Sequence, residues 1–289
     1  MTEVVDRPGA SRMARLRARL GLEGRRGVLT GLLAVILGAW AVAVVASVLA
    51  SGAQGRAVAA LWALGGHGHA VAVDVAAGTL GLAAALALVA LAWIVMTAAM
   101  MLPSSVPMIT LFVATAQKVP GWRLSFCYFL LGYFTVWVGF GMLAFGVDLG
   151  VNALAQAWPW LADNWQVVVA TALAMGAIWQ LTPLKDACLK ECRHPVSFLL
   201  RYYRRGGSAG WQLGIRHGVF CVGCCWALML VMVVSGAAQL ALMGILALIM
   251  FVEKAMPWGE KVVRPVGIAF AVAAVTVLFL GSGAHTHLG

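Results

Sequence analysis

Long apolar runs, separated by short polar segments, make up most of this sequence. A helix that crosses the hydrocarbon core of a bilayer needs about 20 mostly apolar residues. We therefore predict an all-α fold, a polytopic membrane helix bundle with about seven transmembrane helices. The predicted spans are residues 28–50, 75–102, 124–147, 165–183, 217–236, 238–256 and 265–282.

Shorter features complete this pattern. The fifth and sixth spans are predicted to join in a tight hairpin at residues 235–238, which read Ser-Gly-Ala-Ala. Residues 104–117 are apolar but too short to cross, and prolines 103, 107 and 120 flank or interrupt them, so we expect an interfacial or re-entrant helix there. The organisation is thus a basic N-terminal segment (1–27), one transmembrane domain (28–282) and a short external tail (283–289).

Composition supports the membrane assignment. The 289 residues are 63% hydrophobic and only 10% charged, whereas soluble domains carry about 25% charged residues. The chain has too little charge to cover a water-facing surface of its size, and it is too apolar to be disordered.

The net charge of +10 follows from topology. The segments that connect the predicted spans lie alternately on the two sides of the membrane. With this assignment, nineteen of the twenty Lys and Arg residues fall on one side and only Arg56 falls on the other. Basic loops stay in the cytoplasm, so we expect a cytoplasmic N-terminus, an external C-terminus and a bacterial inner-membrane location. The basic segment around residues 12–20 fits an amphipathic helix on anionic lipid or a solvated charge run. The lipid bilayer is an expected partner and nucleic acid is not.

Cysteine and histidine gather in one part of the chain. Five of the six cysteines and two of the six histidines lie within residues 188–225, in the cytoplasmic loop 184–216 or at the start of the next helix. The cytosol keeps thiols reduced, and reduced thiols grouped with imidazoles are ligands for soft metals. The candidate metal ligands are Cys188, Cys192, His194, His217, Cys221, Cys224 and Cys225.

The spacing of these residues suggests two helical stripes. Cys188 and Cys192 are four residues apart, and so are His217 and Cys221, which places each pair on one face of a helix. If the stripes face each other, Cys188, Cys192, Cys221 and Cys224 supply four ligands, with His217 or Cys225 as substitutes. The alternative is that the cysteines only pack as small apolar residues, and Gly218 and Gly223 indicate close helix packing nearby.

Three further residue types bear on the metal. Met96 and Met100 share a helical face at the same end of the bundle, and thioethers beside thiolates favour Cu(I) over zinc, although methionine is also an ordinary core residue. Glu253 interrupts the apolar run of the sixth span, so we expect it to support the metal site or to pair with a loop arginine. Lys254 is expected to snorkel to the membrane interface.

Taken together, these residues resemble a bacterial family of uncharacterised, predicted metal-binding integral membrane proteins, domain-of-unknown-function family 2182. The resemblance covers roughly residues 90–260 and rests on four motifs: Trp93-x-x-Met96-x-x-x-Met100-Met101-x-Pro103, Lys185-x-x-Cys188-x-x-x-Cys192, Gly218-x-x-Cys221-x-x-Cys224-Cys225-Trp226, and Glu253-Lys254. It implies an integral membrane protein that binds metal, and it supplies no reaction.

The sequence therefore predicts a membrane protein that handles a soft metal ion, expected to be copper as Cu(I), by transport, delivery or sensing. A metallochaperone or a membrane complex is the expected protein partner. One alternative is a redox protein whose thiolates hold an iron–sulfur cluster or cycle as dithiols, and zinc is the alternative metal. Another is a structural or assembly protein whose cysteines only pack. No Ser/His/Asp triad or pair of carboxylates is evident, so hydrolysis is not expected.

Overall fold

The computed structural model describes residues 8–50, 81–204, 207–234 and 240–283, and every regular element among them is an α-helix. This confirms the predicted all-α class. The helices are α1 (Pro8–Ala50), α4 (Leu82–Met100), α5 (Leu102–Ala116), α6 (Trp122–Ala157), α7 (Pro159–Asp163), α8 (Trp165–Gln180), α9 (Pro183–Arg193), α10 (Pro195–Tyr202), α11 (Gly207–Val234), α12 (Leu240–Ala255) and α13 (Glu260–Gly283).

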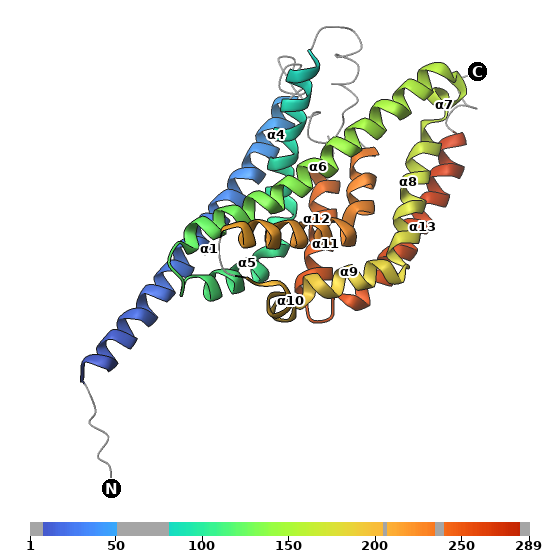
Figure 1. The fold of residues 1–289 in the computed structure, drawn as a ribbon. Coiled ribbons are helices and arrows are strands. Elements are labelled where there is room, and N and C mark those ends of the chain that lie inside the picture. Colours follow the sequence, from blue (N-terminus) through green and yellow to red (C-terminus); the bar gives the residue numbers. More distant parts are fainter. Residues whose placement is uncertain (1–7, 51–80, 205–206, 235–239, 284–289) are drawn as a thin grey trace.

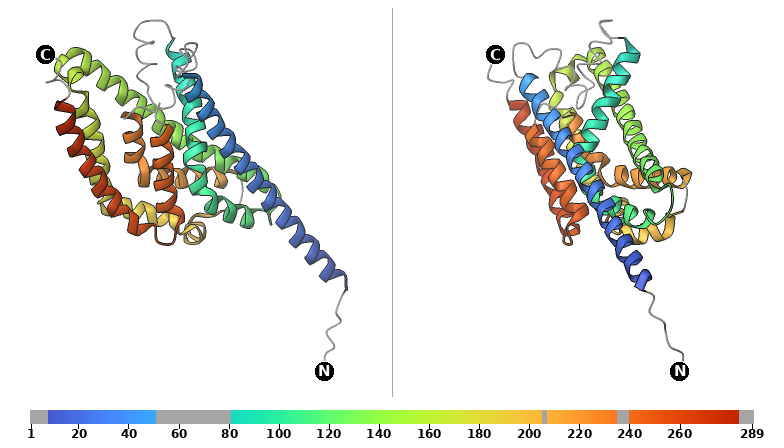
Figure 2. Two further views of the ribbon diagram at one scale, coloured as in Figure 1. Left: turned by 180° about the vertical axis from the view of Figure 1, so that it is seen from behind. Right: turned by 90° about the vertical axis from the view of Figure 1, so that its left-hand side faces the viewer.

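The helices form two pairs with a crossing helix between them (Figures 1 and 2). Helices α1 and α4 lie side by side on one flank, and α8 and α13 on the other. Helix α6 crosses between the flanks and packs along α11 in the middle of the molecule. The short helices α5, α9 and α10 gather at one end, from which the N-terminal part of α1 projects, whereas α7 lies at the opposite end.

Five described helices are long and apolar enough to cross a membrane, which indicates a membrane protein. They contain the segments Arg25–Val48, Leu82–Met100, Trp122–Ala157, Ser208–Val234 and Glu260–Phe279. Helices α8 and α9 pass the same test only together, as a pair bent by 68°. The described residues thus contain five candidate spans, or six if the bent pair forms one span, whereas seven were predicted. The span predicted at 238–256 is described only from Leu240 onward, as the 16 residues of α12.

Other predictions have mixed outcomes. A short apolar helix does occupy the predicted 104–117 region, as α5. The hairpin at 235–238, Arg56 and residues 284–289 lie outside the described residues.

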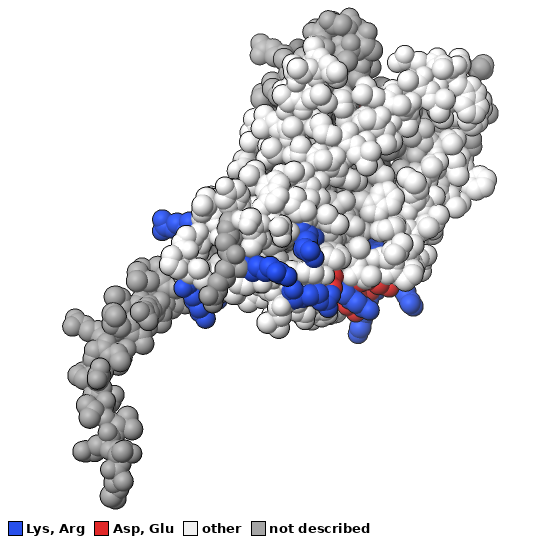
Figure 3. Space-filling model, in the orientation of Figure 1, with Lys and Arg blue, Asp and Glu red and all other residues white. Residues whose placement is uncertain are grey.

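Charge is concentrated at one end of the molecule. On the face shown in Figure 3, the described Lys and Arg side chains gather at the end that carries α9 and α10, and none is seen on the opposite half. This separation is the one that the loop count predicts for a membrane protein with one basic side.

A stripe of glycines brings α11 against α6. Gly210, Gly214 and Gly218 recur every fourth residue on α11, and a Cβ at any of them would collide with α6, at Gly214 with the carbonyl oxygen of Phe129. Small residues at this spacing let two helix backbones approach closely within a membrane. The close packing predicted from Gly218 is confirmed.

The chain breaks sharply between α8 and α9. Thr182 ends the turn, and its hydroxyl accepts a hydrogen bond from the backbone N–H of Lys185 at 3.3 Å, which caps α9. Pro183 occupies the first turn of α9, where its missing N–H costs nothing. The bend turns α9 across the bundle, so that its face with Lys185, Cys188 and Cys192 meets α11 and α12.

Candidate metal centre

Sulfur atoms converge where α9, α11 and the α4–α5 junction meet. The Sγ atoms of Cys192 and Cys224 lie 3.9 Å apart, and the Cys225 thiol points to the Sδ atom of Met101 at 3.7 Å. The thiols of Cys224 and Cys225 donate to the carbonyl oxygen of Cys221, at 3.1 and 2.8 Å. We call Met101, Cys192, Cys221, Cys224 and Cys225 the sulfur cluster. Its three α11 cysteines are buried.

A lysine side chain reaches into the sulfur cluster. The Nζ atom of Lys254, from the last turn of α12, lies 3.2 Å from Cys221 Sγ, 3.5 Å from Cys225 Sγ and 3.8 Å from Met101 Sδ. Lys254 is only 7% exposed. The expectation that it snorkels to the membrane interface is therefore wrong. An ammonium at this distance stabilises the thiolate form of the sulfur that it faces.

A chain of buried hydrogen bonds connects the cluster to His217. The hydroxyl of Tyr133 lies 3.3 Å from Cys221 Sγ and 3.1 Å from the Ser105 hydroxyl, which lies 3.4 Å from Nε2 of His217. The imidazole packs against the rings of Tyr133 and Phe129, with centroids 5.5 and 6.0 Å away. His217 is thus linked to the cysteines through two hydroxyl groups rather than by direct contact.

Glu253 anchors α12 beside the cluster. Its carboxylate accepts from Lys185 Nζ at 2.7 Å and from the amide of Gln180 at 2.8 Å, and all three side chains are buried. Arg193 donates to the backbone carbonyl oxygens of Glu253 and Pro257. Glu253 therefore pairs with a basic residue, as one sequence hypothesis had it, but with Lys185 in place of an arginine. This pair fixes the position from which Lys254 extends.

The region that contains this cluster matches a known family. A model of the family described as "PpoB2: Copper chaperone" matches residues 90–277, more than half of the chain. The chain belongs to this copper chaperone family. No curated protein and no solved structure matches the chain. The family of unknown function that the motifs resemble is not confirmed by name, but the link to metal, and to copper in particular, agrees.

For a copper chaperone, the distances between sulfurs decide whether the ion fits. Among the residues that the structure describes, no group of three or more His, Cys, Asp and Glu side chains has the arrangement of a metal site. Pairs of sulfur atoms do come close enough. Since a metal–sulfur bond measures about 2.3 Å, two sulfurs on one ion lie within about 4.6 Å. Cys192 and Cys224 are 3.9 Å apart, and Cys225 and Met101 are 3.7 Å apart.

The structure brings only part of the predicted ligand set together. Cys188 lies on the same face of α9 as Cys192, with its Sγ atom 2.8 Å from where a Cβ on Gly223 would stand. His194 is exposed at the end of α9. Met96 and Met100 are buried in the same hydrophobic core as the three cysteines of α11.

Sequence reasoning missed Met101, Lys254 and Tyr133 as neighbours of the cysteines. Met101 follows Met100 directly, but consecutive helix positions are about 100° apart. The face shared by Met96 and Met100 therefore did not include Met101, the methionine that lies beside Cys225. The sequence does mark Lys254 as a functional candidate, because an ionisable group inside an apolar run is costly. Nothing in the sequence marks Tyr133, because its position beside the cysteines depends on the contact between α6 and α11.

Proposed function

We propose that this protein binds copper as Cu(I) at the sulfur cluster, with Cys192 and Cys224 as its primary ligands and with Cys221, Cys225 and Met101 as further donors. Cys188, on the same face of α9, is the nearest replacement ligand. The copper is cargo, held on the cytoplasmic side of the bacterial inner membrane and passed on to a partner protein.

The observation that carries the proposal is the short Cys192–Cys224 distance between two helices that are far apart in sequence, inside a chain of the copper chaperone family. Thiolates and thioethers are soft donors that favour Cu(I). Helix α11 supplies three thiols from two adjacent turns, and the bend after α8 brings the fourth to them.

Charge also favours a monovalent ion. Two thiolates carry two negative charges, and Cu⁺ leaves one of them uncompensated. The Lys254 ammonium, 3.2 Å from Cys221 Sγ, supplies the missing positive charge, so the filled site is neutral. With a divalent ion the same two thiolates and ammonium would leave a net positive charge in an apolar interior, which is costly.

The direct test is copper content. Full-length protein is purified anaerobically in detergent, loaded with Cu(I), desalted and analysed for metal. We expect stoichiometric copper in the wild type and its loss in Cys192→Ser/Cys224→Ser. The matched control is Cys127→Ser, which removes an exposed thiol on α6 outside the cluster. Equal copper in the double variant and the control would refute the proposal.

The Cys192–Cys224 distance also favours one alternative, a dithiol redox pair. Two thiols at 3.9 Å need only a small movement to form a disulfide. Mass analysis after mild oxidation and alkylation distinguishes the two functions. A redox role requires a Cys192–Cys224 disulfide that forms reversibly in the cell, whereas a copper role requires both thiols to be free when copper is absent.

A further inference from the structure

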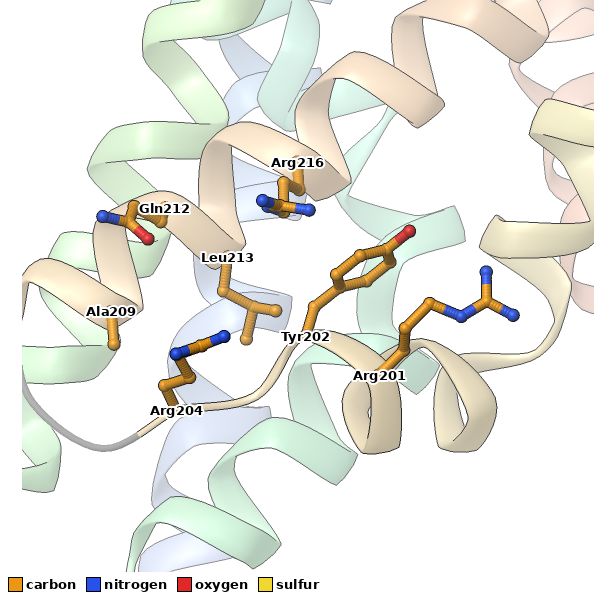
Figure 4. A pocket seen from close by; sticks show the side chains of 7 residues that line it. All are labelled: Arg201, Tyr202, Arg204, Ala209, Gln212, Leu213 and Arg216. Atoms are coloured by element: carbon orange, nitrogen blue, oxygen red, sulfur yellow. The ribbon is translucent and has the colours of Figure 1, made fainter.

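A second polar site lies apart from the sulfur cluster. A pocket of about 220 Å³ opens between the end of α10 and the first turns of α11 (Figure 4). Its lining includes Arg201, Tyr202, Arg204, Gln212, Leu213 and Arg216. Three guanidinium groups and a carboxamide thus surround one small space.

The ring of Tyr202 orders two of these arginines. The guanidinium carbon of Arg216 lies 4.7 Å from the ring centroid and that of Arg201 lies 5.7 Å away. In Figure 4 the ring stands between the two, while Arg204 approaches Leu213 from below. A guanidinium that packs on an aromatic ring keeps its N–H groups free to bind an anion.

The positive charge of this pocket is only partly compensated. Arg201 forms an ion pair with Glu191 at 2.8 Å. Among the described residues, Arg204 and Arg216 form no ion pair. Two uncompensated guanidinium groups at one small pocket repel each other, and a bound anion with more than one oxygen would relieve that repulsion.

We propose that this pocket binds a phosphate group, carried either by a free phosphate anion or by the headgroup of an anionic phospholipid. The forked guanidinium matches two phosphate oxygens at once, and the Gln212 amide can add a neutral hydrogen-bond donor. The volume is below the roughly 300 Å³ at which pockets for drug-sized ligands begin, which suits a phosphate group alone. The site lies at the basic end of the molecule, the end expected to face the anionic cytoplasmic leaflet.

This inference does not depend on copper, so it is tested on the metal-free, full-length protein. Titration calorimetry in non-ionic detergent measures the affinity for inorganic phosphate. Native mass spectrometry after incubation with phosphatidylglycerol or phosphatidylcholine measures retained lipid. The pocket variant is Arg204→Gln/Arg216→Gln. The control is Arg123→Gln/Arg264→Gln, which removes the same charge from two exposed arginines on α6 and α13.

We expect the pocket variant to lose at least about tenfold in affinity or retention, because the loss of even one charge-assisted hydrogen bond to the phosphate lowers the affinity by about that factor. The control is expected to match the wild type. Binding of inorganic phosphate identifies a free anion as the source, and selective retention of phosphatidylglycerol identifies a headgroup.

Three results would overturn the proposal: no binding of either probe to the wild type, unchanged binding by the pocket variant, or equal loss in pocket variant and control. If the pocket variant does not fold, Arg204→Lys/Arg216→Lys takes its place. Lysine keeps the charge but lacks the fork, so a several-fold loss is again expected, and unchanged binding would contradict the proposed geometry.

Discussion

At the scale of single residues, the two adjacent charged side chains of α12 connect the sulfur cluster to the rest of the bundle. Glu253 and Lys254 are adjacent but serve different partners: Glu253 accepts from Lys185 and Gln180, and Lys254 donates to sulfur. Because side chains at consecutive helix positions diverge by about 100°, one turn of α12 presents an acid to α8 and α9 and a base to the cysteines. The buried Lys185–Glu253 pair fixes this turn in place.

The charge balance at the sulfur cluster makes a prediction for Lys254→Met, which keeps the length of the side chain and removes its charge. The copper-loaded site would then retain an unpaired negative charge. Removing one partner of a buried ion pair costs about 3–5 kcal/mol, and each 1.4 kcal/mol is tenfold in affinity. We therefore expect Cu(I) affinity to fall at least about tenfold, as measured by competition with a Cu(I)-specific chelator.

The control for this experiment is Lys261→Met, the same change at an exposed position on α13. It is expected to bind Cu(I) as the wild type does. An affinity that is unchanged in Lys254→Met would show that the ammonium does not compensate the charge of the filled site.

The residue scale also shows what sequence can identify. Grouped cysteines and an ionisable pair in an apolar run pointed to Cys192, Cys221, Cys224, Cys225 and Glu253 without any structure. The direction of Lys254 was not accessible, because snorkelling and inward pairing differ only in which face of α12 is buried. That choice is made by contacts with other helices.

At the scale of elements, the glycine stripe of α11 holds the site in register. Gly214 lies against the Phe129 carbonyl of α6, and one turn further along α6 Tyr133 meets Cys221 across the same interface. A side chain at position 214 would push the two helices apart and lengthen that hydrogen bond.

Gly214→Ala is therefore expected to destabilise the protein by about 1–3 kcal/mol, the usual cost of overpacking a core. Thermal unfolding in detergent measures the loss. The matched control is Gly139→Ala on α6, where nothing lies within 4 Å of an added Cβ, and alanine there should be neutral or stabilising. A Gly214→Ala protein as stable as Gly139→Ala would mean that the interface tolerates a wider separation.

The sequence located most of the long helices, but it did not predict how the chain bends between them. Apolar runs located α1, α4, α6, α11 and α13, because a span in lipid must satisfy its backbone internally and so is a continuous helix. The end of α8 was predicted, because the fourth span was placed at 165–183, but the 68° bend that leads into α9 was not. Without that bend, α9 would not meet α11. The sequence could therefore suggest that the two cysteine stripes face each other, but it could not show that Cys192 and Cys224 are in contact.

At the scale of the whole molecule, the basic end seen in Figure 3 predicts the orientation in the membrane. Asp163→Cys on α7 and Lys261→Cys on α13 are both exposed positions, and they are introduced separately into a Cys127→Ser background. In intact spheroplasts, a membrane-impermeant maleimide should label position 163 and not position 261. Labelling at 261 should require permeabilisation.

The parent Cys127→Ser protein reports the background from the cluster cysteines, which are buried or half-buried. Labelling of position 261 in intact spheroplasts would invert the topology and place the sulfur cluster nearer the outer face. The orientation then decides which compartment can load or unload copper.

The division of the cluster between helices has a mechanical consequence. Cys221, Cys224 and Cys225 are carried by one continuous helix that glycines clamp to α6, so their mutual positions change little. Cys192 and Lys254 come from α9 and α12, which reach the cluster through a bent connection and a short helix. If copper binds here as proposed, α11 supplies the part of the site that stays fixed, and α9 and α12 supply the parts that can move. An opening that admits or releases the ion would then come from movement of α9 or α12.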